Sequence, residues 1–185
     1  MRYSFRIAGS ANEFQQIRRL NHQIFSDELG QHVARPDGIL ADPLEARSRY
    51  LIALLHELVV GMVCVHDDPP WSVTKRLAQA AILDTLPPPL LEVRLLAVAP
   101  EHRNRLVLAG LLAGLLELAL ERGFRTLLIS GVTSQVRMYR RLGFVELGPA
   151  VAEGQATFYP MALDLQTVPP HTVESWQRYH QRRIS

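Results

Sequence analysis

The stretch from Leu91 to Gly123 constrains the fold of this 185-residue chain most strongly. Its first part, Leu91 to Val98, is rich in branched apolar residues and predicts a strand. From Leu106 to Leu120 most residues favour a helix, and Gly123 stands where a helix C-cap belongs. The sequence therefore predicts a strand, a short basic turn and a long apolar helix in direct succession.

This succession predicts an anion site at the start of the helix. The first backbone amides of a helix lack partners within it and carry partial positive charge, so a phosphate placed there is stabilised. Arg103 and Arg105 lie beside these amides and add two guanidinium groups. Phosphate or pyrophosphate is therefore the ligand that we expect. The alternative is that both arginines are solvated charges of an exposed turn.

Five residues here follow the spacing V-x-P-x-x-R followed by seven residues and L-L: Val98, Pro100, Arg103, Leu111 and Leu112. The pattern resembles the acyl-coenzyme A loop of the GNAT N-acetyltransferase superfamily. That loop carries R/Q-x-x-G-x-G/A, and Leu106 and Leu108 occupy its glycine positions in this chain. The resemblance implies that a single set of residues binds acetyl-CoA or another acyl-CoA: Leu96, Ala97, Val98, Arg103, Asn104, Arg105, Leu106, Val107, Leu108 and Ala109.

A second motif, Y-x-x-x-G-F at Tyr139, Gly143 and Phe144, also resembles the GNAT proteins. The family frequently places Asn and Ala before this motif, where the chain has Val132 and Gln135. The resemblance implies that Tyr139 lies near the thioester sulfur. A phenol, with a pKa of about 10, can protonate a departing thiolate. The alternative is that Tyr139 only packs its ring against the sheet.

Acyl transfer to an amine also needs a base, because the nucleophile must lose a proton. Glu92 on the predicted strand is the candidate for this role, acting directly or through water. Side chains alternate along a strand, so Glu92 and Arg94 share one face. The alternative is that these two residues pair on a partly wet face of the sheet.

The resemblance implies an α/β (α+β) fold with a mixed, largely antiparallel central sheet flanked by helices. We expect one acyltransferase domain over residues 1–165 and a tail or peripheral helix over 166–185. Local patterns predict further elements, which are a first strand at Tyr3–Ile7, a helix capped by Ser10 and Glu13 that ends near Gly30, a hairpin of Arg49–Leu55 and Leu58–Val65, a short helix at Ala78–Asp84, a strand at Thr126–Ser130, a turn at Gly131–Ser134, a helix at Gln135–Leu142, and strands at Phe144–Leu147 and Thr157–Leu165 joined by a connection at Gly148–Gly154.

Two loops suggest where substrates bind. The polar loop 30–48 and the residues before it hold several groups that can contact an acyl acceptor, although such groups also keep a surface hydrated: Asp27, Glu28, His32, Asp37 and Asp42. The insertion Asp67–Pro89 either roofs an acyl pocket or covers a sheet edge. As a roof it would offer apolar lining residues: Trp71, Val73, Leu77, Ile82 and Leu83.

A narrower resemblance links NHQIFSDELGQH, residues 21–32, to the N-acyl amino acid synthases and acyl-homoserine lactone synthases. These GNAT relatives take long acyl chains, commonly from acyl carrier protein. The resemblance implies an acyl pocket larger than acetyl requires.

Composition excludes several other classes. The net charge is only +2, which predicts neither nucleic-acid nor anionic-membrane binding. Cys64 is the single cysteine, and the seven histidines show no metal spacing, so we expect no metal site. The N-terminus lacks the apolar core of a signal peptide, and charges follow the apolar helix too soon for a membrane span. We therefore expect a cytoplasmic protein, with a homodimer possible.

The predicted function is that of an N-acyltransferase, which moves an acyl group, most simply acetyl, from acyl-coenzyme A to a primary amine or amino-acid acceptor. One alternative is a long-chain N-acyl amino acid synthase that uses acyl carrier protein. Another is a module that senses acyl-CoA without turnover, and amine-dependent thiol release separates that module from an enzyme.

Overall fold

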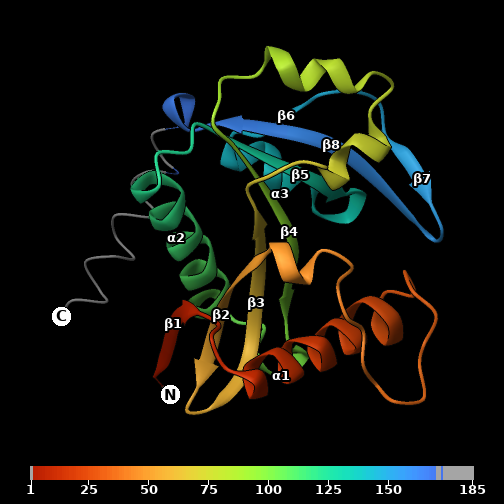
Figure 1. Ribbon diagram of the computed structural model, residues 1–185, viewed down its shortest axis with the longest axis vertical. Coiled ribbons are helices and arrows are strands. Elements are labelled where there is room, and N and C mark those ends of the chain that lie inside the picture. The colour runs from red at the N-terminus through yellow and green to blue at the C-terminus, as the bar shows by residue number, and fades with distance from the viewer. Residues whose placement is uncertain (1, 170–171, 173–185) are drawn as a thin grey trace. The chain divides into compact units, whose positions relative to one another are not determined.

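The computed structural model describes residues 2–169 and Thr172 (Figure 1). Most of the C-terminal tail or peripheral helix predicted at 166–185 falls outside these residues. The chain divides into two compact units. Of the described residues, the first contains 2–65 and Leu95–Leu116, and the second contains His66–Arg94, 117–169 and Thr172. The predicted division into residues 1–165 and a tail stays a prediction.

The helices and strands have the following bounds. The strands are β1 Tyr3–Ile7, β2 Arg49–Leu55, β3 Leu58–His66, β4 Leu90–Val98, β5 Thr126–Val132, β6 Val145–Glu146, β7 Val151–Glu153 and β8 Ala156–Asp164. The α-helices are α1 Ala11–Asn21, α2 Arg105–Glu121 and α3 Val136–Leu142, and a π-helix covers His22–Glu28.

Strand pairing confirms the predicted sheet class. The pairs β1–β2, β2–β3, β5–β8, β6–β8 and β7–β8 are antiparallel, whereas β4 and β5 are parallel. The hairpin of β2 and β3 turns through His56 and Glu57, as predicted. His56 adopts a φ of 55°, a left-handed conformation that tight hairpin turns require. The sheet is mixed and largely antiparallel, and α-helices accompany it in both units.

Helix α1 covers strands β2 and β3 within the first unit (Figure 1). Its buried side chains Ile17 and Leu20 join an apolar cluster with Tyr50 and Ile52 of β2 and Met62 of β3. These helix positions recur at helical spacing, so one face of α1 meets the sheet. The predicted periodicity of this helix is confirmed.

The helix continues past α1 in a form that the sequence did not reveal. His22–Glu28 is a π-helix, and Leu29 N–H donates to the carbonyl of Ile24, five residues earlier. A π-helix places residues five apart next to each other, and His22 Nδ1 accordingly lies 3.1 Å from Asp27 Oδ2. Apolar periodicity predicts a helix here but does not distinguish the π form from the α form.

The second unit differs from expectation in three places. The turn predicted at Gly131–Ser134 begins later, because Gly131 and Val132 still belong to β5. The predicted connection Gly148–Gly154 contains strand β7, so that part of the prediction is wrong. Gly154 adopts a φ of 60° and allows β7 to turn directly into β8. The insertion forms two 3-10 turns, Ser72–Arg76 and Ala80–Thr85, in place of one short helix.

The insertion packs against a sheet face and not only along an edge. Val73 and Leu83 form an apolar cluster with Leu128 of β5 and Ala162 of β8, joined by partly buried residues: Trp71, Leu77, Ile82, Leu86, Leu90 and Leu147. The insertion and α3 lie on opposite sides of β5 and β8 (Figure 1). The apolar side chains of the insertion therefore complete the core of the second unit.

Helix α2 begins and ends within one residue of the predicted helix, and Gly123 follows it with a φ of 74°. In the first unit it packs closely on β3, because a Cβ on Gly61 would lie 3.1 Å from Val107 Cγ1. A larger residue at this position would force the Val107 side chain to move, so the strand favours glycine here. No described helix is both long and apolar enough to span a bilayer.

The capping box at the start of α1 allows a stability test. Ser10 Oγ accepts from Glu13 N–H at 3.2 Å, and the Glu13 carboxylate accepts from the N–H groups of Gly9 and Ser10. Hydrogen bonds from Arg6 and from these two amides lower the pKa of Glu13 from 4.5 to about 2. Because the folded-state pKa is the lower one, the ionised carboxylate stabilises the fold above about pH 5, and this contribution is lost toward pH 2.

We expect Glu13→Gln to lower the free energy of unfolding by about 1 kcal/mol at pH 7, the usual contribution of a cap. The difference from wild type should shrink as the pH falls from 5 toward 2, which urea unfolding at several pH values measures. Glu57→Gln, in the exposed hairpin turn, is the control and should be neutral. An equal loss for Glu13→Gln at pH 7 and pH 3 would contradict the assignment.

Candidate active site

Strand β4 contains an irregularity directly before the residues that are predicted to bind the thioester. Leu95 has a φ of 50°, in the left-handed region that residues other than glycine rarely adopt. The parallel register between β4 and β5 ends at Val93 and Ile129. Leu96, Ala97 and Val98 follow as the last residues of the strand. Irregular strand backbone of this kind recurs beside active sites.

The carboxylate of Glu92 is buried and holds the start of the insertion. One oxygen accepts from Ser72 N–H at 2.8 Å, and the other accepts from Ser72 Oγ at 2.8 Å and Val73 N–H at 2.6 Å. Only 1% of the Glu92 surface is exposed. Three donors therefore fix the 3-10 turn Ser72–Arg76 to β4. This geometry favours a positioning role, and the predicted role of Glu92 as general base stays a prediction.

Tyr139 lies on α3 with its ring against β5. A Cβ on Gly131 would lie 2.8 Å from Tyr139 Cδ2, so only glycine allows this close approach. Phe144 meets the ring edge-on at a centroid distance of 6.0 Å. Burial raises the pKa of Tyr139, which keeps the phenol protonated beyond its ordinary pH range. The phenol is therefore protonated at neutral pH, as a proton donor must be.

The two candidate catalytic residues lie on opposite faces of the second unit's strands. Glu92 and Leu128 are register partners on β4 and β5, so their side chains share the face that the insertion covers. Gly131, three residues after Leu128, points to the other face, where Tyr139 packs. The insertion therefore covers the face of β5 that Glu92 shares, and α3 places the Tyr139 phenol on the opposite face.

The N-terminus of α2 already has a capping residue. Asn104 Oδ1 accepts from Leu106 N–H at 3.0 Å and from Val107 N–H at 3.1 Å. These amides are two of those predicted to bind phosphate, and a side-chain oxygen now satisfies them. Leu106, at the first family glycine position, is 55% exposed. Its side chain therefore does not fill the space between the helix start and the strands.

Arg103 is also engaged within the first unit. Its two terminal nitrogens donate to the two oxygens of Glu28 at 2.7 and 2.5 Å, and Nε donates to the carbonyl of Val98 at 3.1 Å. The Arg103 hydrogen bonds lower the pKa of Glu28. The guanidinium therefore binds an oxyanion in this structure, although that anion is a carboxylate of the same chain. Arg105 is exposed.

The acidic groups of the predicted acceptor loop have separate partners. Asp42 is buried and accepts from Tyr50 Oη at 2.9 Å and from Leu44 N–H at 3.2 Å. Desolvation, assisted by the charge on Asp42, raises the pKa of Tyr50. Asp37 accepts from Ile39 N–H, which lowers its pKa. Among the described residues, no three His, Cys, Asp or Glu side chains are grouped as a metal site would require.

His22 connects the π-helix to the same loop, a contact that sequence reasoning missed. Its Nε2 accepts from Arg35 N–H at 2.8 Å, so this nitrogen carries no proton. The proton therefore lies on Nδ1, which donates to Asp27. A bidentate pair of Arg18 with Glu45 holds the far end of the loop. No local sequence pattern predicts these contacts. The bonds of His22 with Arg35 and of Arg18 with Glu45 join residues 13 or more positions apart, and the bond of His22 with Asp27 depends on the π-helix.

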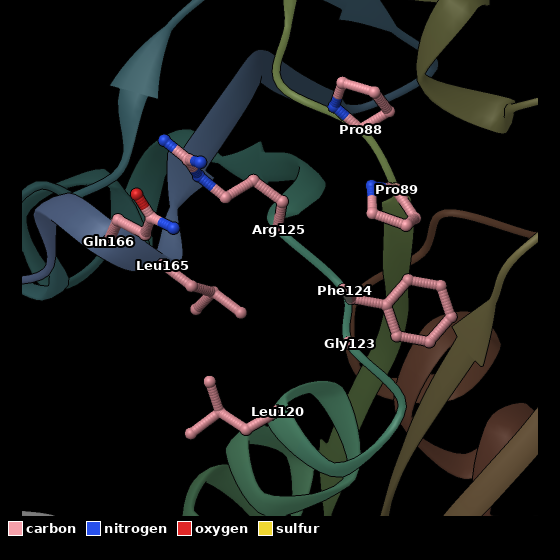
Figure 2. A pocket seen from close by; sticks show the side chains of 8 residues that line it. All are labelled: Pro88, Pro89, Leu120, Gly123, Phe124, Arg125, Leu165 and Gln166. Carbon is pink, nitrogen blue, oxygen red and sulfur yellow. The ribbon is translucent and has the colours of Figure 1, made fainter.

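Each unit contains a cavity, and neither cavity is lined by Glu92 or Tyr139. A cavity of about 380 Å³ in the second unit is lined by Pro88, Pro89, Leu120, Gly123, Phe124, Arg125, Leu165 and Gln166 (Figure 2). Figure 2 shows Leu120 and Leu165 facing each other across it. It lies where β4 and β5 begin, whereas Ser130 and Gly131 lie near the end of β5. A cavity of about 200 Å³ in the first unit is lined in part by Arg19, Glu101 and His102.

Comparison with solved structures identifies proteins of similar fold. The CoA-dependent acyl-homoserine lactone synthase BjaI, in a structure with MTA, is 20% identical with a TM-score of 0.76, and the match covers 97% of this chain and 89% of that chain. FeeM, an N-acyl amino acid synthase from uncultured soil microbes, is 18% identical with a TM-score of 0.73, covering 94% and 98%. ElaA of Escherichia coli is 14% identical with a TM-score of 0.62, covering 88% and 100%.

No curated protein sequence matches the chain. A family model does match residues 14–144, and its description is the acetyltransferase (GNAT) family. The match covers most of the chain and includes β4, the turn before α2, and α3 with Tyr139. Together with the mixed sheet and the strand–turn–helix unit, it shows that this chain belongs to the GNAT acetyltransferase family.

Proposed function

We propose that the protein is an N-acyltransferase that moves an acyl group, most simply acetyl, from acyl-coenzyme A to a primary amine. The observation that carries this proposal is the family match over residues 14–144. The matched range contains the irregular strand, the arginine-bearing turn and the buried phenol that such a reaction can use. The acyl-CoA acts as a co-substrate, and the amine is the second substrate.

Tyr139 is the proposed general acid. As the thioester breaks, the coenzyme A sulfur becomes a thiolate, and protonation by a nearby phenol prevents the reverse reaction. The raised pKa of Tyr139 keeps its proton available at neutral pH. The backbone groups of Leu96–Val98 are the proposed partners of the thioester carbonyl and the pantetheine amides, because the φ of Leu95 interrupts regular strand geometry directly before them.

The coenzyme A phosphates are proposed to bind at the start of α2. Glu28 and the Asn104 side chain place acceptor oxygens against Arg103 and the first helix amides. Phosphate oxygens are acceptors of the same kind with more charge, so they can take these places. Arg105 and the backbone of Val107–Ala109 complete the proposed site. Binding then requires Glu28 to leave Arg103.

A second candidate is a synthase that takes a longer acyl chain, supplied by coenzyme A or by acyl carrier protein. Its support is the similarity of fold to BjaI and FeeM. Each methylene that moves from water into an apolar site gains about 0.8 kcal/mol. An amine or amino-acid acceptor suits both candidates.

Thiol release tests the proposed function directly. We would incubate the protein with acetyl-, octanoyl- or palmitoyl-CoA and follow free thiol with and without a panel of primary amines and amino acids. Release that depends on the amine supports the enzyme. A kcat/KM that falls steadily from acetyl upward excludes the long-chain candidate. Saturable thioester binding without release by any amine would instead indicate a sensor.

Tyr139→Phe tests the proposed acid. The change keeps the ring that packs on Gly131 and removes only the hydroxyl, so we expect unchanged stability. The kcat should fall by about 10²-fold or more, the usual contribution of acid catalysis. Tyr159→Phe, a change to the register partner of Gly131 on β8, is the matched control and should keep full kcat. Full kcat for Tyr139→Phe would leave this tyrosine as a packing residue.

Glu28→Gln and Arg103→Ala test the proposed phosphate site in opposite directions. Removing the Glu28 charge frees Arg103, so coenzyme A should bind several-fold more tightly in isothermal titration calorimetry. Arg103→Ala should weaken binding by about 1–3 kcal/mol, the range for charge-assisted hydrogen bonds. Glu57→Gln is the control with unchanged affinity. Weaker binding by Glu28→Gln with unchanged binding by Arg103→Ala would refute the site.

A further inference from the structure

Arg76 ends the 3-10 turn that Glu92 anchors, and its guanidinium is largely shielded from water. Only 13% of its side-chain surface is exposed. The guanidinium carbon lies 4.2 Å from the centre of the Phe158 ring of β8, which is the geometry of a cation–π contact. Nη1 donates to Ser130 Oγ of β5 at 3.3 Å. Two separate contacts within the second unit therefore hold this guanidinium in place.

The hydrogen bonding of this cation is incomplete. Nη2 donates to a carboxylate oxygen of Glu153, on β7. The buried Nε–H has no acceptor among the residues that the structure describes. A shielded guanidinium normally fills all its donors, because an unmet donor away from water costs free energy. An anion that also accepts from Nε–H would therefore satisfy this guanidinium more completely than Glu153 does.

Glu153 is a partner that can leave. Its side chain is 56% exposed, whereas Arg76 is shielded, so the carboxylate can turn into water while the guanidinium stays in place. Glu153 sits in the last pair of the β7–β8 hairpin, beside the turn at Gly154. The bond from Arg76 therefore shows which chemistry fits this position, namely a carboxylate.

The position of Arg76 relates it to the proposed reaction. Ser130 lies one residue beyond the end of the β4–β5 register and one residue before Gly131, on which Tyr139 packs from the other face. Arg76 therefore contacts the same short segment of β5 as the proposed acid, but from the side of the insertion. An acceptor at this segment could place its amine toward the reaction and its carboxylate on Arg76.

We propose that Arg76 binds the carboxylate of an amino-acid acceptor and that Glu153 is an internal competitor for the same guanidinium. This inference rests on the proposed acyltransferase function and deepens it, because it names the acceptor as an amine that carries a carboxylate. Binding of the acceptor exchanges one carboxylate for another, so the shielded cation is never left without a counter-ion. Acceptors that lack a carboxylate must leave Glu153 in place.

The test compares acceptors that differ only in the carboxylate. L-leucine with isoamylamine and L-phenylalanine with phenethylamine are such pairs, assayed with the acyl-CoA that wild type uses best. Arg76→Gln should raise KM for the amino acids at least 10-fold and change KM for the decarboxylated amines less than 2-fold. Glu153→Gln should lower KM for the amino acids several-fold and leave the amines unchanged. Arg76→Lys should recover only part of the selectivity, since an ammonium lacks the planar fork.

Arg140→Gln is the matched control, because Arg140 forms an exposed pair with Glu146 in the same unit and should leave both acceptor classes unaffected. Chemical unfolding of each variant checks its fold. Equal effects of Arg76→Gln on amino acid and amine, or none on either, would overturn the proposal. If no amine supports turnover in wild type, the acyltransferase proposal fails. Calorimetric titration of L-leucine into wild type and Glu153→Gln then decides the Arg76 site separately.

Discussion

The buried carboxylate of Glu92 is the contact on which the second unit most depends. The carboxylate accepts three hydrogen bonds from two consecutive residues, Ser72 and Val73, and so fixes the first turn of the insertion to β4. This 3-10 turn places Arg76 at its last position and Val73 in the apolar cluster of the unit. A buried charge is tolerated here because every donor around it is aligned, and removing it would leave those donors unmet.

The two faces of β5 have different chemical environments. On one face Gly131 lets the ring of Tyr139 approach the strand closely, and burial raises the pKa of that phenol. The face with Glu92 and Arg76 instead holds charged side chains that are hydrogen-bonded within the protein, Glu92 by neutral donors and Arg76 by Glu153. In the first unit, Arg103 is likewise paired with an acid of the same chain. Arg76 and Arg103 are thus both occupied by internal carboxylates, so the ligand binding proposed at each of them is an exchange of partners.

Local signals in the sequence predicted much of the fold. Ser10 and Glu13 formed the expected capping box, and Gly143 ended α3 with a φ of 103°. These features depend on neighbouring residues, so a pattern of a few positions suffices. No local pattern predicts the donors around Glu92, because they lie on a segment about 20 residues earlier in the chain. The left-handed φ of Leu95 has no local signal either, because leucine does not favour it and the tertiary structure imposes it. The family motifs therefore indicated candidate residues without indicating their partners.

The most direct test of this account is Glu92→Gln, with stability and kinetics measured on the same protein. A positioning role predicts that the free energy of unfolding falls by about 1–3 kcal/mol, because an amide NH₂ then faces a donor. It also predicts coupling with Ser72→Ala in a double-mutant cycle and a loss of activity mainly through acceptor KM. Wild-type stability together with a kcat at least about 100-fold lower would contradict the account and make Glu92 the general base.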